Sequence, residues 1–318
     1  MKNFQFGRIG VLMGGYSSER EISLKSGKGI FEALKGCGCN VIAIDITATE
    51  KEKIFSEIKE SKIEVAFIAL HGALGEDGTI QSILENARIP YTGSGVAASR
   101  LAINKVLTQK CLQEKGVPVP PFLIVRKEDL GSIENKIKGF PVFVKPSSQG
   151  SSIGISLVEG PGGLKAALGE AFKYDEEVLV DRYIEGKELT VGILDQNVLP
   201  VIEIRPTHKF FDFSAKYQSG MTDYIIPAEI TSDVAKCVQE IALKAHLALG
   251  CLDMSRVDVM LDKKNNPFVL EINTIPGFTT TSLLPKAAKA AGMNFSELCL
   301  KLVELAYRKT KHPQVSLA

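Results

Sequence analysis

Two neighbouring segments carry oxygen-rich side chains within otherwise apolar runs. Ser255–Leu261 contains Asp258, and Val269–Asn273 contains Glu271 and Asn273. A short polar turn separates the segments, so we expect an antiparallel hairpin on which all three side chains share one face. Such a set of hard oxygen ligands suits Mg²⁺ bound through carboxylates and substrate phosphates. The alternative is a solvated polar face, which we disfavour because an unpaired carboxylate within apolar strands is costly.

A basic residue and a helix entrance lie beside this predicted metal site. Arg256 is expected on the same strand face as Asp258, where a fixed cation can stabilise charge developing on a transferred phosphoryl group or a tetrahedral oxyanion. The loop at 273–283 then enters a helix. Its backbone N–H groups and the hydroxyl of Ser282 are suited to bind a carboxylate.

A second polar loop follows a strand that ends on a lysine. After Lys145, the segment 146–154 is rich in serine and glycine and leads into another strand. Backbone N–H groups in such a loop can surround an anion, and the lysine supplies a point charge for phosphate. The spacing is not that of a Walker A loop. An ordinary hairpin with a polar tip is an equally good interpretation of this segment alone.

A glycine-rich turn near the N-terminus also enters a helix. In Gly14–Glu21, the helix N-terminus attracts a carboxylate and Glu19 can pair with an ammonium group. The alternative is a simple helix cap, in which Ser17 or Ser18 is paired with Glu21, and both can hold together.

Two further candidates for function are a histidine and a long loop. His71 stands at a strand end before a glycine, and a packed histidine without a role is an equally good interpretation. The apolar residues of the stretch 206–228 show neither helical nor strand periodicity, and a loop of that length is usually a functional lid or disordered. Lys216 and Tyr217 in this stretch can reach a bound nucleotide when the loop closes, unless it is an ordinary surface loop.

The elements that must position these residues follow from the apolar patterning. Residues 1–96 alternate strand and helix with short connections, which predicts a parallel sheet covered by helices. Ligands of such sheets sit at the carboxyl ends of the strands. We expect a second domain over 97–183, beginning with one helix at 97–115, and a third over 184–318, which holds the hairpin and the lid. The strands expected in the two later domains are 122–125, 141–145, 152–158, 177–181, 188–194, 198–205, 256–262 and 267–272.

The bulk composition restricts the class of protein. The chain has 318 residues, 45% of them hydrophobic, and a net charge of +1, so neither nucleic acid nor a disordered acidic arm is indicated. Its six cysteines lack zinc-ligand spacing and are expected to be reduced thiols. No apolar run approaches the roughly 20 residues of a membrane span, and no signal peptide is evident. We therefore expect a soluble cytoplasmic protein with no membrane partner.

Several short motifs, taken in order, resemble those of the D-alanine–D-alanine ligase family, which has the α/β ATP-grasp fold. The resemblance extends from Gly10 to about Leu305, and the ordered combination is highly specific. The matching pieces are Gly14-Gly15-x-Ser17-x-Glu19-Arg20-Glu21, Ala69-Leu70-His71-Gly72, Gly75-Glu76-Asp77-Gly78, Tyr91-Thr92-Gly93-Ser94, Lys145-Pro146, Gly150-Ser151-Ser152-x-Gly154, Ala215-Lys216-Tyr217, Arg256-x-Asp258 and Glu271-x-Asn273-Thr274-x-Pro276-Gly277.

The resemblance implies a set of site residues around ATP and two Mg²⁺ (or Mn²⁺) ions. Residues matching nucleotide-binding positions are Lys105, Lys145, Ser152, Glu177, Asp181, Arg182, Ile184, Glu188 and Lys216. Those matching metal ligands are Asp258, Glu271 and Asn273. Those matching catalytic positions are Glu19, Ser151, Tyr217, Arg256 and Gly277. Those matching substrate-binding positions are Glu19, His71, Ser282 and Leu283. Members of the family are commonly homodimers, so the resemblance also implies a homodimer.

The implied reaction joins two D-alanines through an acyl phosphate for peptidoglycan precursor synthesis. Tyr217 favours the dipeptide over the related product with D-lactate, since depsipeptide ligases carry other residues there. A non-catalytic nucleotide-binding module is disfavoured because the metal ligands and Arg256 are all present. Two departures from many relatives are Asp181-Arg182 in place of Glu-Lys, which weakens Asp181 as an adenine contact, and Thr281 in place of a histidine.

Overall fold

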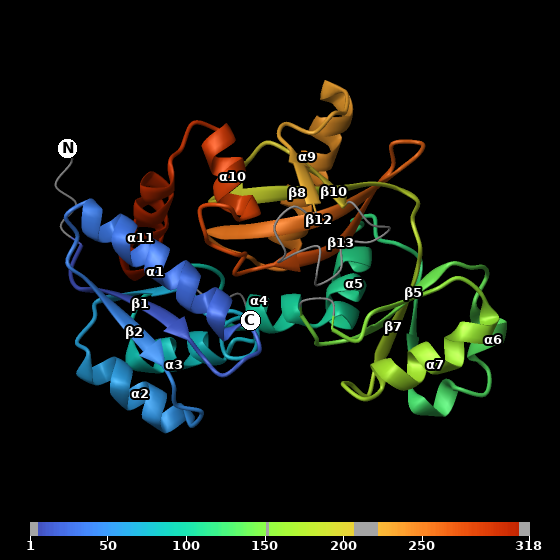
Figure 1. Cartoon of the computed structure of the whole chain (residues 1–318), viewed down its shortest axis with the longest axis horizontal. Helices are drawn as coiled ribbons and strands as arrows, with labels where there is room; N and C mark the ends of the chain where they lie inside the picture. Colours follow the sequence, from blue (N-terminus) through green and yellow to red (C-terminus); the bar gives the residue numbers. More distant parts are fainter. Residues whose placement is uncertain (1–5, 151–152, 207–221, 312–318) are drawn as a thin grey trace.

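The N-terminal part of the computed structural model is a small parallel sheet covered by helices on both faces (Figure 1). The structure describes residues 6–150, 153–206 and 222–311. Strand β1 (Ile9–Gly14) lies between β2 (Val41–Ile46) and β3 (Val65–Ile68), and both pairings are parallel. The accompanying helices are α1 (Arg20–Gly36), α2 (Lys51–Glu60) and α3 (Thr79–Ala87).

The alternation of side chains along β1 explains how both faces are covered. Val11 and Met13 pack in one apolar cluster with residues of α1 and of the last helix, α11 (Phe295–Lys311). Leu12 packs in a separate cluster with residues of α2 and α3. Since β1 and β3 are covered on both faces, all their residues are buried, as expected for a parallel sheet.

The middle part of the chain forms an antiparallel sheet with strand order β4-β7-β5-β6. Helix α7 contributes Leu164 and Leu168 to the apolar cluster on this sheet. The elements of this part are α4 (Val96–Ile103), α5 (Lys105–Glu114), β4 (Phe122–Val125), the 3-10 helix η1 (Lys127–Asp129), α6 (Ile133–Lys136), β5 (Val142–Pro146), β6 (Ser156–Val158), α7 (Pro161–Ala171) and β7 (Val178–Arg182).

The prediction of one continuous helix over 97–115 is wrong, since the chain forms two. Asn104 adopts an extended conformation between α4 and α5, and its side chain accepts a hydrogen bond from the Leu107 N–H, at 2.9 Å. Asparagine is a strong N-cap residue, so it stabilises the start of a second helix at this position. The helical spacing of apolar residues continues through Asn104 and does not reveal the break.

The last part contains the largest sheet of the described residues, with order β11-β10-β8-β12-β13 and the short β9 paired to β8. One face of this sheet packs against α9, where Val257 and Val259 meet Val238 and Ala242. The elements are β8 (Gly186–Leu194), β9 (Asn197–Val198), β10 (Ile202–Pro206), β11 (Thr222–Ile225), α9 (Ser232–Ala248), β12 (Met254–Asp262), β13 (Pro267–Asn273), α10 (Leu283–Ala290) and α11.

The stretch 206–228, expected to lack regular structure, includes part of a strand pair. Strand β10 continues to Pro206 and pairs with β11, which begins at Thr222. Lys216 and Tyr217, predicted to act from this stretch, lie outside the described residues, as do Ser151 and Ser152. None of the described helices is long and apolar enough to cross a bilayer.

Candidate active site

The open face of the largest sheet carries the polar residues singled out in the sequence. In the register of β12 and β13, Arg256 lies opposite Asn273 and Asp258 lies opposite Glu271. Directly opposed residues of an antiparallel pair point to the same face. The expected hairpin therefore forms, and it brings all four side chains to one face of the sheet. Glu188 shares that face, because it is two positions from Thr190, which lies opposite Asp258.

Arg256 is held in place by the carboxylate two residues further along its strand. Its Nε and one terminal nitrogen donate to the two oxygens of Asp258, at 2.9 and 2.8 Å. Thr190 Oγ1 also donates to Asp258, at 2.6 Å. A two-point guanidinium–carboxylate contact fixes orientation as well as charge. The Arg256 cation is thus aimed into the site before any substrate arrives, which is the property that electrostatic catalysis requires.

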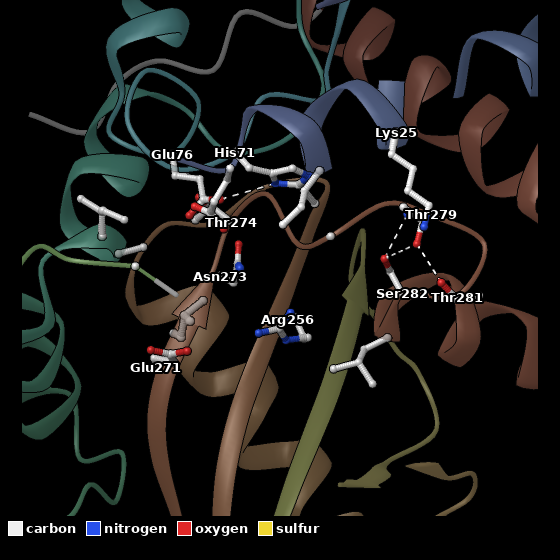
Figure 2. A pocket seen from close by; sticks show the side chains of 18 of the residues that line it. Lys25, His71, Glu76, Arg256, Glu271, Asn273, Thr274, Thr279, Thr281 and Ser282 are labelled. Carbon is white, nitrogen blue, oxygen red and sulfur yellow. Dashed lines mark hydrogen bonds and ion pairs between the residues drawn. The ribbon is translucent and has the colours of Figure 1, made fainter. Parts of the chain in front are cut away.

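The loop between β13 and α10 forms one wall of the site and is rich in hydroxyl groups. Asn273 Oδ1 accepts from the Ile275 N–H, at 3.0 Å, and so fixes the start of the loop. At its end, Ser282 Oγ accepts from the Thr279 N–H, at 3.0 Å, and lies 2.8 Å from Thr279 Oγ1. Ser282 is the N-cap residue of α10, yet its side chain makes no capping bond to the helix. Its hydroxyl belongs to this turn at the cavity wall instead (Figure 2).

The opposite wall comes from the N-terminal sheet. Glu19 immediately precedes α1, and its N–H donates to Ser17 Oγ, at 3.2 Å. Ser17 in turn donates to the carbonyl oxygen of His71, at 2.8 Å, which joins the β1 turn to the loop after β3. The capping alternative for Ser17 or Ser18 is not observed, because the N-cap position is occupied by Glu19 and no side chain caps the helix.

His71 is a packed histidine that also reaches the cavity. It is only 4% exposed, its Nε2 lies 3.2 Å from Ser26 Oγ, and its Nδ1 lies 3.6 Å from Glu76 Oε1. Both His71 and Glu76 line the cavity. The two interpretations of this residue are therefore compatible, since it is buried within the wall and faces the site.

A buried ion pair lies in the middle sheet. Lys145 Nζ and Asp181 Oδ2 are 2.6 Å apart, and the Asp181 side chain is only 2% exposed. The other oxygen, Asp181 Oδ1, is buried and has no hydrogen-bond partner within the described chain. An unsatisfied buried acceptor is unfavourable, so this oxygen is expected to accept from a water molecule or from a donor of a ligand. An exocyclic amine of a purine is a donor of this kind.

Lys105 joins the serine-rich loop to the main cavity. This lysine begins α5, is 9% exposed, and its N–H donates to the carbonyl oxygen of Ser147. Its ammonium donates to the carbonyl oxygen of Gln149 in the same loop. Gly150, the next residue of the loop, lines the cavity together with Lys105. These contacts bring the loop that was predicted to surround an anion to the edge of the sheet that carries Glu271.

These groups surround a cavity of about 350 Å³. Three separate parts of the chain contribute to it, and Figure 2 shows Arg256 between Glu271 and Ser282. The predicted site residues that line the cavity are Glu19, His71, Lys105, Arg256, Glu271, Asn273, Gly277, Ser282 and Leu283. The described ones that do not are Lys145, Glu177, Asp181, Arg182, Ile184, Glu188 and Asp258.

Glu177 is placed away from the Lys145–Asp181 pair. It immediately precedes β7, whereas Arg182 is the last residue of that strand. The Glu177 carboxylate accepts a hydrogen bond from the guanidinium of Arg126. The side chain of Arg126 is 58% exposed, so this contact lies at the surface. A role for Glu177 in nucleotide binding stays a prediction that this contact does not favour.

The donors on the sheet face fit a divalent cation that also binds substrate phosphates. Glu271 and Asn273 line the cavity, and Asp258 lies behind Arg256. A carboxylate offers about four lone-pair positions. Arg256 and Thr190 use three of those on Asp258, which leaves it some capacity. In the part of the chain that the structure describes, no group of three acidic, histidine or cysteine side chains could alone hold a metal ion. A bound Mg²⁺ would therefore take waters or phosphate oxygens as further ligands to complete its shell.

Comparison with known proteins places the chain in a family. A family model described as the D-ala D-ala ligase C-terminus matches residues 111–304, and one described as the N-terminus matches residues 48–94. A D-alanine–D-alanine ligase of Pelotomaculum thermopropionicum is 46% identical over 310 residues, which cover 94% of this chain and 96% of the relative. The chain belongs to the D-alanine–D-alanine ligase family. The resemblance inferred from the short motifs is confirmed.

Solved structures of D-alanine ligases share the fold. The ligase from Bacillus anthracis complexed with ATP has a TM-score of 0.84 and 36% identity, covering 96% of this chain and 99% of that one. The VanG D-Ala:D-Ser ligase from Enterococcus faecalis has a TM-score of 0.82 and 33% identity, covering 95% and 100% of the two chains. The predicted ATP-grasp fold is confirmed by these neighbours.

Sequence reasoning about this D-alanine–D-alanine ligase family member missed several lining residues. Lys25 on α1, Glu76 after β3, Tyr224 on β11 and Thr279 in the loop all face the cavity. Tyr224 lies within the stretch 206–228, where the sequence shows no periodicity that would mark it. Glu76 stood within a quoted motif, and its place five residues after His71 was the available signal.

Proposed function

We propose that this ligase joins two D-alanines to D-alanyl-D-alanine, using ATP and giving ADP and phosphate. One observation carries the proposal: a single cavity combines an acidic group, a fixed arginine and a hydroxyl-rich helix entrance. Glu19 is suited to the ammonium of the first D-alanine, and Ser282 to the carboxylate of the second. Arg256 lines the same cavity as both of these residues.

In the first step, the carboxylate of one D-alanine attacks the γ-phosphorus of ATP and displaces ADP, giving an acyl phosphate. Lys105 and Lys145 neutralise charge on the phosphates, because both are held near the serine-rich loop. Mg²⁺ ions held by Asp258, Glu271 and Asn273 would supply further positive charge at the transferred phosphoryl group. We assign the unsatisfied Asp181 Oδ1 to the adenine amine, and further nucleotide contacts to Arg182 at the end of β7, Ile184 in the connection that follows and Glu188 in β8.

In the second step, the amine of the other D-alanine attacks the acyl carbon and phosphate leaves. The tetrahedral intermediate carries an oxyanion, and we assign its stabilisation to Arg256 and the Gly277 N–H, which both line the cavity. The nitrogen loses a proton as the amide forms. Water must be excluded, since it would hydrolyse the acyl phosphate. We assign that exclusion to closure of the stretch that contains Lys216 and Tyr217, with Ser151 and Glu19 holding it closed.

The proposal also covers the domain boundaries, the oligomeric state and the cellular location of the protein. We divide the chain at 1–96, 97–183 and 184–318, so that each part holds one of the three sheets formed by the described residues. The substrates are small molecules, and we infer a homodimer that works in the cytoplasm on peptidoglycan precursors.

Phosphate release tests the proposed function. The purified protein is incubated at neutral pH with ATP, Mg²⁺ and D-alanine, with parallel tubes containing L-alanine, D-alanine plus D-lactate, or D-alanine plus D-serine. Release with D-alanine alone, and the dipeptide by mass spectrometry, is the expected result. Product only with D-lactate or D-serine would move the assignment to a ligase for mixed products. No phosphate in any tube from folded, ATP-binding protein would refute the enzyme assignment.

A further inference from the structure

Lys25 is a cation at the active-site cavity for which the fold offers no partner in the described ranges. It lies on α1, is exposed, and lines the cavity. Its side chain points from the helix toward Thr279 (Figure 2). No hydrogen bond or ion pair joins Lys25 to another described residue. Arg256 and Lys105 differ in this respect, because Arg256 is paired with Asp258 and Lys105 donates to the Gln149 carbonyl oxygen.

The wall that Lys25 faces is built from donors. Thr279 Oγ1 lies 3.1 Å from Thr281 Oγ1 and 2.8 Å from Ser282 Oγ, so three hydroxyl groups form a connected set at the start of α10. Hydroxyl hydrogens can rotate toward an acceptor, and a helix start favours negative charge. The described part of this wall contributes no carboxylate to neutralise the lysine. An anion between Lys25 and this turn would satisfy both sides.

The position along the cavity indicates which anion this is. Glu271, Lys105 and Gly150 mark the end near the phosphates, where the first substrate must react. Lys25 and Ser282 lie at the other end, beyond Arg256 (Figure 2). We propose that Lys25 binds the carboxylate of the second, attacking amino acid together with Ser282. This inference rests on the proposed function, since it assigns one further binding residue for the same reaction.

Kinetics can separate this role from a structural one, because only one substrate contact should be affected. We expect Lys25→Met to raise the KM for the second D-alanine roughly tenfold, the size of a charge-assisted hydrogen bond reduced for solvent exposure. The KM for ATP and for the first D-alanine should stay within about twofold. Trapping of the acyl phosphate with hydroxylamine, a step that needs only ATP and the first D-alanine, should be unchanged.

Two further variants provide the controls. Lys28→Met makes the same change of charge on the same helix, at an exposed residue that does not line the cavity, and should leave all constants unchanged. Lys25→Arg keeps the cation and should restore most of the affinity. The loss in Lys25→Met should also shrink at high salt, since exposed charges are screened within about 10 Å at 0.1 M salt.

The outcomes distinguish this inference from the proposed function. An unchanged second KM in Lys25→Met, in an active protein, would overturn the role of Lys25 and leave the ligase assignment intact. An equal rise in the first KM would also overturn it, by placing the lysine at the other subsite. Absence of dipeptide formation by the unmodified protein would instead refute the proposed function, on which the role of Lys25 rests.

Discussion

A buried ion pair ties the N-terminal sheet to the sheet that carries the site, and its removal should destabilise the protein measurably. Asp253 Oδ2 lies 2.6 Å from Lys309 Nζ and accepts from the Gly93 N–H, at 2.9 Å. Lys309 also donates to the carbonyl oxygens of Tyr91 and Gly93. The connection therefore joins the start of β12, the last helix and the segment after β3.

The magnitude follows from which groups lose their partners. Removing one member of a buried ion pair costs about 3–5 kcal/mol. The Lys309 side chain is 27% exposed and keeps two carbonyl partners, so the lower figure applies to its loss of Asp253. Asp253 also has φ +57°, a left-handed conformation that costs alanine about 1–2 kcal/mol. We expect Asp253→Ala to lower the free energy of unfolding by about 4 kcal/mol.

Asparagine at the same position is the matched comparison. It tolerates left-handed backbone and can still accept from Gly93, so Asp253→Asn should cost only about 1–2 kcal/mol. Burial is the largest influence on both partners, raising the pKa of Asp253 and lowering the pKa of Lys309. Because each shift favours the neutral form, the pair contributes little net stability as a whole. The double variant Asp253→Asn/Lys309→Met should therefore cost less than the sum of its single changes.

Urea unfolding of the unmodified protein, the Asp253→Ala, Asp253→Asn and Lys309→Met variants and the double variant tests this reasoning, with hydrogen exchange of the Gly93 amide as a local measure. Separate substitutions that add within about 0.5 kcal/mol would show that the two side chains are not coupled, and would refute it. A loss below about 1 kcal/mol for Asp253→Ala would refute the magnitude.

Three other substitutions have definite expected outcomes. His246 is buried with Nδ1 2.7 Å from Ser255 Oγ, and burial lowers its pKa from 6.5 to about 4. Because this pKa is lowered in the folded state, the stabilisation is present above pH 6.5 and is lost as the pH falls toward 4, by about 3 kcal/mol in all. The free energy of unfolding of His246→Phe, measured by urea titration at a series of pH values, should therefore depend less on pH across that range. Gly186→Ala would place a Cβ 1.8 Å from the Leu261 carbonyl oxygen, and should cost about 3 kcal/mol by the same unfolding assay; a loss under 1 kcal/mol would contradict this. Asp181→Ala should weaken ATP binding about tenfold or more in calorimetry while sparing the KM for D-alanine, and equal effects on both would count against an adenine contact.

The hairpin that carries the site could be predicted from the sequence because acidic residues stand within otherwise apolar strands. Asp258 and Glu271 stand in apolar strands, and strand periodicity fixes which side chains share a face. The pairing of Asp258 with Arg256 was not accessible in the same way. The spacing of the two residues along the strand predicted that they share a face. The two-point contact depends on side-chain rotamers, which are determined by packing in the folded protein. The expected metal role and the observed arginine contact now compete for the same oxygens.

The break between α4 and α5 has a local cause, because the Asn104 side chain caps the second helix, yet it was missed because the apolar pattern continues through this position. The role of Lys25 depended instead on a contact between distant segments, which no local pattern reveals. Lys25 is an exposed residue of α1, and nothing in the local sequence distinguishes it from an ordinary solvated position. Only the approach of the Thr279–Ser282 turn, from the other end of the chain, makes it part of the cavity.

The packing of α11 on the N-terminal sheet affects how the protein is made. Val65 and Phe67 of β3 share a cluster with Val303 and Ala306 of α11, so segments from opposite ends of the chain complete one core. A ribosome that has released β3 has yet to synthesise the helix that covers it. That apolar face must stay open during most of translation, and it is where we expect nascent chains to engage chaperones or one another.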